Sequence, residues 1–154
     1  MAKLTSDMIG TIKAAMLSFV ATVNADGTPN LSPKASLIAK DDSLFFANIC
    51  SPQTISNLLR NPAIAVNVVD IFERRGYRFS GIAAVLSQGD PDFEAIASWV
   101  HEVNGEEYPV NHVVKITVSD ARPLLSPAYK FGNKPTPEEL RKINMKKYGV
   151  QKLG

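Results

Sequence analysis

The stretch Ala47-Asn-Ile-Cys-Ser-Pro-Gln-Thr54 joins the end of an apolar strand to the beginning of a helix. Ser51 is expected to cap this helix, and Pro52 suits its first turn because the N–H that proline lacks would have no partner there. The unpaired N–H groups of Gln53 and Thr54, with the Thr54 hydroxyl, then point beyond the end of the strand. Because such a terminus attracts anions, the stretch predicts a site for a phosphate-bearing ligand. An ordinary helix cap that binds nothing is the alternative interpretation.

Strand-like sequence precedes this stretch. A strand is expected over 17–23, and Asn24-Ala-Asp-Gly-Thr28 is a strong turn signal because Asp-Gly supplies the positive φ of a tight hairpin. A second long strand is expected over 29–40, with Pro33 inside it. Proline cannot donate to a strand ladder, so Pro33 marks an edge, a bulge or a break that faces a ligand.

Further elements follow the central stretch. A helix is expected at 6–16, at the start of the chain. After the central stretch and its helix, a continuous apolar run predicts a buried strand, and two more strands and two more helices follow it. Thr136-Pro-Glu-Glu139 is a complete capping box and opens the last helix. The expected elements after the loop are a helix at 52–60, strands at 63–71 and 77–88, a helix at 90–103 and a strand at 112–119. Six strands joined by turns predict a mainly β (α+β) fold, a six-stranded antiparallel barrel with short peripheral helices.

Composition narrows the class of protein. The chain has 154 residues, which fits one domain with a substantial core. Its formal charge of +2 gives no reason to expect a nucleic-acid or membrane partner. One cysteine excludes an internal disulfide framework, and neither a secretion signal nor an apolar run long enough to cross a bilayer is present in the sequence. The expected location is the cytoplasm.

Four runs, in this order along the chain, together resemble the FMN-binding split-barrel family, which is related to pyridoxamine 5′-phosphate oxidase. They cover much of residues 15 to 120, and their order carries the resemblance more than any single motif. The runs are Ser18-Phe-Val-Ala-Thr-Val-Asn-Ala-Asp-Gly-Thr-Pro-Asn-Leu-Ser-Pro-Lys34, Leu44-Phe-Phe-Ala-Asn-Ile-Cys-Ser-Pro-Gln-Thr-Ile-Ser-Asn-Leu-Leu-Arg-Asn-Pro62, Arg75-Gly-Tyr-Arg-Phe-Ser-Gly-Ile-Ala and Asp92-Phe-Glu-Ala-Ile-Ala-Ser-Trp99.

The resemblance implies a split β-barrel that binds FMN noncovalently in clefts between the two subunits of a homodimer. It implies one FMN-binding domain over 1–154, with a core at about 15–120 and a proline-rich arm and C-terminal helix at 121–154. The implied function is a flavin-dependent oxidoreductase that exchanges hydride or electrons with an unidentified small molecule or redox partner. Lys34, expected near the ring edge, would stabilise the negative charge of the reduced flavin.

The resemblance also implies a set of cofactor-binding residues. The second strand would face the flavin, and the strand–loop–helix would hold the chain and the phosphate. The implied residues are Ser32, Pro33, Lys34, Ala35, Ser36, Asn48, Ile49, Cys50, Ser51, Gln53, Thr54 and Asn57. Relatives often place Arg or Lys at the positions of Pro52 and Gln53, so here Lys34, with Arg75 or Arg78, is expected to supply the positive charge.

Other interpretations stay open. A non-catalytic carrier or sensor would expose the ring edge to a protein, whereas a reductase needs a hollow beside the flavin. Haem would need His101 or His112 as axial ligand, and a deazaflavin would need a longer basic groove. The two histidines have no metal-site spacing, no side chain is identifiable as a general acid or base, and Cys50 is expected to be buried and inert.

Overall fold

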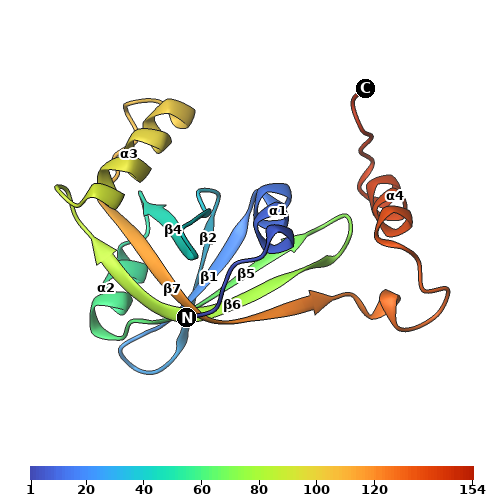
Figure 1. The fold of residues 1–154 in the computed structure, drawn as a ribbon, viewed down its shortest axis with the longest axis horizontal. Helices are drawn as coiled ribbons and strands as arrows, with labels where there is room; N and C mark the ends of the chain where they lie inside the picture. The colour runs from blue at the N-terminus through green and yellow to red at the C-terminus, as the bar shows by residue number, and fades with distance from the viewer.

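The computed structural model describes residues 1–154, which form a curled antiparallel sheet, a half-barrel, with four helices around it (Figure 1). The seven strands run in the order β2-β1-β5-β6-β7-β4-β3, and the split-barrel α+β class is confirmed. None of the helices is both long and apolar enough to span a bilayer. The elements are α1 (Ser6–Ala15), β1 (Ser18–Val23), β2 (Pro29–Lys34), β3 (Ile38–Lys40), β4 (Ser43–Asn48), α2 (Pro52–Arg60), β5 (Ala63–Asp70), β6 (Arg75–Leu86), α3 (Pro91–Asn104), β7 (His112–Leu125), a 3₁₀ turn (Pro127–Tyr129) and α4 (Pro137–Tyr148).

The single strand expected over 29–40 is two strands, which is why the sheet has seven strands and not six. β2 pairs only with β1 and β3 only with β4, so the two strands form opposite edges of the sheet. Residues 35–37 carry the chain from one edge to the other. Pro33 therefore lies on an edge strand, where a missing ladder donor is tolerated. Of the three interpretations of Pro33, the edge position is the one observed.

β7 continues past its expected end at 119 and reaches Leu125. Its partner β4 stops at the pair Ser43–Thr117, so the remainder of β7 pairs with β6 alone and tolerates Pro123. The register of the β6–β7 ladder shifts between Ser80 and Gly81. A Cβ added to Gly81 would lie 2.2 Å from the Thr117 carbonyl oxygen, so this close approach of two strands requires glycine.

Strand β4 is buried on both of its faces, and all six of its residues are buried. Leu44 and Phe46 point into the main core between the sheet and α1. Phe45 and Ala47 point the other way and pack against α3 in a second apolar cluster. The absence of polar alternation in this strand follows from this arrangement, because neither face meets water.

Helix α2 is fixed to the β1–β2 hairpin by a polar cluster centred on Asn57, whose side chain is completely buried. The Asn57 amide nitrogen donates to Thr22 Oγ1 at 3.0 Å and to Asn24 Oδ1 at 2.9 Å. Its oxygen accepts from Gln53 Nε2 at 2.9 Å and from Arg60 at 3.2 Å. The beginning of α2 is thereby held in one position relative to β2.

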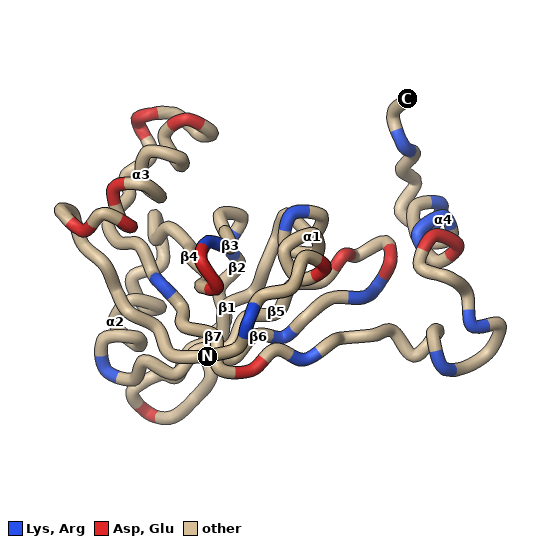
Figure 2. The backbone as a smooth tube through the Cα atoms, viewed as in Figure 1, with Lys and Arg blue, Asp and Glu red and all other residues tan.

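The β5–β6 hairpin and the end of β7 extend away from the barrel and carry α4 at their far end (Figure 1). Arg141 of α4 donates to Asp70 at 2.5 Å and to Glu73 at 3.1 Å, and Asn144 donates to the Phe72 carbonyl at 2.8 Å. Basic residues gather on α4, whereas acidic residues are prominent on α3 at the other end of the molecule (Figure 2). The capping box expected for α4 is confirmed.

Replacing Asn57 with alanine should lower the free energy of unfolding by about 2 kcal/mol, because the buried groups around it lose their hydrogen-bond partners. Urea unfolding followed by circular dichroism measures the change. The matched control is Asn133→Ala in an exposed loop, which should unfold like the parent protein. Equal stability of the two variants would contradict an anchoring role for Asn57.

Candidate functional site

A buried lysine lies where β2, the end of β4 and the beginning of α2 meet. Only 7% of Lys34 is exposed. Its ammonium donates to Ser32 Oγ at 2.7 Å and to Ser51 Oγ at 2.5 Å, and it lies 5.6 Å from the centroid of the Phe46 ring. Lys34 takes part in none of the ion pairs of the chain. The site therefore contains a desolvated cation without a carboxylate, an arrangement that an anionic ligand would stabilise.

The electrostatics of Lys34 agree with its position. Burial lowers the pKa of its ammonium below the usual value for lysine, and the negative charge that the nearby Cys50 sulfur carries when it is ionised opposes part of that shift. An anion bound beside the ammonium would raise this pKa again, because an opposite charge favours the charged form.

The expected cap by Ser51 is wrong. No side chain caps α2, and the Ser51 hydroxyl instead accepts a hydrogen bond from Lys34. The first N–H groups of a helix have no partners within the helix, so those of Gln53 and Thr54 are left without a side-chain acceptor at Ser51. The Ser51 hydroxyl accepts from Lys34 and not from the N–H groups of α2. Ser51 therefore lies between two positive groups, the Lys34 ammonium and the uncapped N-terminus of α2.

The Thr54 hydroxyl does not point beyond the end of β4 as expected. Thr54 is 1% exposed, and its hydroxyl accepts a 3.5 Å hydrogen bond from Asn30 inside the molecule. Asn57 is likewise buried below the helix, in the cluster that anchors α2. Gln53 is exposed on the outer side of the same turn. At this terminus, the backbone N–H groups of Gln53 and Thr54 are therefore better placed for a ligand than the side chains of Thr54 and Asn57.

Side chains alternate along β2 and divide the residues expected to face a flavin. Ser32 and Lys34 point to the inner side, whereas Pro33 is exposed on the other side with Leu31. Beyond β2, Ala35 is exposed. Ser36 lies beside β4, where its hydroxyl accepts from the Ala47 N–H at 3.2 Å.

The end of β4 adds an unsatisfied acceptor. Asn48 is buried, and its Oδ1 has no hydrogen-bond partner. The carbonyl of the next residue, Ile49, accepts from Asn111 at 3.2 Å. Cys50 is exposed, contrary to the expectation that it is buried, because the chain leaves the sheet at this point to begin α2.

The structure thus brings Ser32, Lys34 and Ser51 together at the N-terminus of α2. It does not bring Arg75 there, since that side chain bonds Glu73 at 2.7 Å on the extended hairpin. Arg78 donates to Asn67 on the neighbouring strand. The polar residues Thr22, Asn24, Asn30 and Arg60 support the site and were missed, because only the pairing of β1 with β2 and the docking of α2 place them nearby.

Comparison with known proteins identifies the family. The family model of pyridoxamine 5′-phosphate oxidase matches residues 7–125. The crystal structure of HupZ from Group A Streptococcus is 31% identical, with a TM-score of 0.70, and the alignment covers 80% of this chain and 95% of HupZ. No curated protein sequence matches.

Two more distant structures share the fold. An FMN-binding protein from Syntrophomonas wolfei has 15% identity and a TM-score of 0.64, over 75% of this chain and 82% of its own. The haem storage protein HutZ from Vibrio cholerae has 16% identity and a TM-score of 0.64, over 87% of this chain and 100% of its own. With the split-barrel fold and the matched residues together, the chain belongs to the pyridoxamine 5′-phosphate oxidase family.

Proposed function

We propose that this protein binds FMN noncovalently at a homodimer interface and acts as a flavin-dependent oxidoreductase on a small molecule. The observation that carries the proposal is the buried Lys34 ammonium, which has two hydroxyl partners and no carboxylate. The family match and the name of the Syntrophomonas wolfei protein support a flavin as the ligand.

The residues present fit a phosphate-bearing cofactor. Lys34, Ser32 and Ser51, together with the backbone N–H groups of Gln53 and Thr54, would hold the phosphate, since they offer one positive charge and several donors at a helix N-terminus. The buried Oδ1 of Asn48 lacks a donor and would accept one from the cofactor.

When bound, FMN would supply the hydride or electron transfer, and the protein would supply orientation and electrostatics. The positive charge of Lys34 would stabilise the negative charge of the cofactor phosphate. β4 and α2 would exclude water from this site. No side chain at the site is assigned as an acid or base. A small-molecule substrate or redox partner would exchange electrons with the cofactor.

The outer face of the sheet supports the homodimer. Phe19, Leu31 and Ile71 are 42%, 65% and 52% exposed. They line a hollow of about 700 Å³ over β1, β2 and β5 that is otherwise mainly apolar. An apolar face of this kind is typical of a protein–protein interface, and a second copy of the chain would cover it.

The Lys34→Met variant should bind FMN about tenfold to a hundredfold more weakly, since a hydrogen bond to a charged group contributes about 1.5–3 kcal/mol. Titration of the purified protein with FMN, followed by absorbance and flavin fluorescence, measures the affinity. Riboflavin serves as the comparison ligand: a loss confined to FMN assigns Lys34 to the phosphate, and a loss for both assigns it to the ring. The control Lys130→Met, an exposed lysine, should bind like the parent protein. Absence of FMN binding by the parent protein would contradict the flavin proposal.

The same substitution should make the ligand-free protein more stable, because burial of the Lys34 charge opposes folding. The pKa of Lys34 is lowered in the folded state, so between that pKa and 10.5 the unfolded chain binds more protons. The free energy of unfolding of the parent protein therefore increases as pH rises through this range. The amount by which Lys34→Met is more stable than the parent should accordingly shrink from pH 7 towards pH 10. Urea unfolding at several pH values measures the difference in stability between the two proteins. A difference that grows with pH would contradict a buried, destabilising charge at Lys34.

A second candidate function, haem binding, is favoured by His112. This residue lies opposite Asn48 in the β4–β7 ladder, its Nδ1 is buried without a partner, and it lines a cavity of about 810 Å³ beside α2. The name of the Vibrio cholerae relative agrees with this alternative. His101, by contrast, bonds the Tyr108 carbonyl at 3.0 Å.

Adding haemin to the protein should, on this alternative, produce a Soret band that His112→Ala removes and His101→Ala leaves unchanged. Absorption spectroscopy decides between the two candidates, since bound FMN gives flavin bands instead. A protein that binds FMN and leaves the spectrum of haemin unaltered would exclude the haem candidate.

A further inference from the structure

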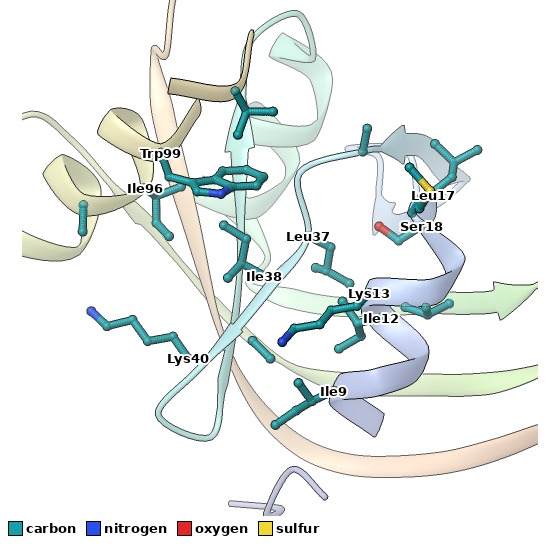
Figure 3. A pocket seen from close by; sticks show the side chains of 16 residues that line it. Ile9, Ile12, Lys13, Leu17, Ser18, Leu37, Ile38, Lys40, Ile96 and Trp99 are labelled. Carbon is teal, nitrogen blue, oxygen red and sulfur yellow. The ribbon is translucent and has the colours of Figure 1, made fainter. Parts of the chain in front are cut away.

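A third cavity, of about 650 Å³, lies between α1, the segment that leads into β3, and α3 (Figure 3). Its walls are mostly apolar: Ile12 comes from α1, Leu37 and Ile38 precede and begin β3, and Ile96 and Trp99 come from α3. Figure 3 shows the Trp99 indole projecting from α3 beside Ile38. The volume falls in the range of small-molecule sites.

This cavity begins where the Lys34 site ends. Ala35, the residue after Lys34, lines it, and so does Ser18. The Ser18 hydroxyl is buried and donates to the Lys34 carbonyl at 3.0 Å. A molecule in the cavity would therefore lie next to the strand that carries the proposed cofactor-binding residues Ser32 and Lys34.

The cavity carries a positive charge, which comes from one lysine side chain without an ion-pair partner. The Lys13 side chain runs from the last turn of α1 into the space beside β3 (Figure 3). Lys13 forms no ion pair, and no Asp or Glu lines the cavity. The other lysine, Lys40, is bound by Asp92 at 2.8 Å, and the same carboxylate holds Lys115 at 2.9 Å.

We infer that this cavity binds the substrate of the protein and that the substrate is an apolar carboxylate, aliphatic or aromatic. Its apolar body packs against Ile38, Ile96 and Trp99, and its carboxylate pairs with Lys13. The role as substrate site rests on the proposed flavin function, whereas the binding itself follows from the shape and charge of the cavity alone.

The position of Trp99 allows a direct test, because it is the only tryptophan of the chain. Decanoate is the probe, and decanol is its neutral counterpart. Titration of the flavin-free protein with decanoate should change the Trp99 emission in a saturable way. The Lys13→Gln variant should bind decanoate about fivefold more weakly, as expected for loss of a partly exposed ion pair, and should bind decanol unchanged. The exposed Lys3→Gln is the matched control.

A second variant keeps the test independent of Lys13. Ala95→Phe, on the exposed side of α3 at the cavity wall, should weaken binding of both decanoate and decanol without unfolding the protein. Absence of a saturable emission change, or equal decanoate affinity in the parent, Lys13→Gln and Ala95→Phe proteins, would overturn the inference. So would a Trp99 emission that follows protein concentration and not decanoate, because a second copy of the chain would then fill the cavity.

The FMN titration separates this inference from the proposed function. Decanoate binding that depends on Lys13 in a protein that ignores FMN would retain the cavity as a carboxylate site and remove its role beside a flavin. FMN binding without decanoate binding would retain the flavin function and remove this class of substrate.

Discussion

The double burial of β4 is the constraint on which the rest of the molecule depends. One face of the strand closes the main core through Leu44 and Phe46, and the other receives α3 through Phe45 and Ala47. A strand packed on both sides cannot slide or tilt without opening a cavity in the core. Such a cavity would cost much of the free energy by which buried aromatic side chains stabilise the fold. The loop after Asn48 therefore starts from a fixed point, and so does the helix α2 that follows it.

The two halves of the site depend on this strand in different ways. The Phe46 ring lies below the Lys34 ammonium, while Phe45, on the opposite face, belongs to the cluster that holds α3 and with it the wall of the apolar cavity. A polar compartment with a buried cation and an apolar compartment with a free lysine thus lie on either side of a short segment of chain. Relatives named for FMN and for haem share this fold, so the chemistry must be argued from these side chains and not from the barrel.

Local signals in the sequence predicted many of the elements correctly. The bounds of α2 agree with the structure, as does the capping box of α4, and the Asp-Gly turn joins β1 to β2 as expected. The central stretch at 47–54 also pointed to the place where the buried Lys34 lies, although for a partly wrong reason. There Ser51 was expected to serve the helix, whereas it serves a lysine 17 positions earlier in the chain.

The errors share a physical origin, which is dependence on partners distant in sequence. Whether 29–40 is one strand or two depends on which strands lie beside each half, and β7 extends past 119 because β6 continues beside it. The inward direction of Thr54 follows from contact with Asn30 of β2. Propensities and turn signals carry no information on such contacts, because these contacts form only when the sheet assembles.

The two edges of this open sheet have a consequence for solubility. An unclosed barrel exposes two edge strands with unpaired backbone groups, and such a strand can pair edge to edge with a strand of another molecule, which leads to fibrils. Here one edge, β2, contains Pro29 and Pro33, and the other edge, β3, has only three residues. Proline removes donors and a short strand offers few, so neither edge is a good template for an added strand. The sheet can therefore stay unclosed while its two edges resist aggregation.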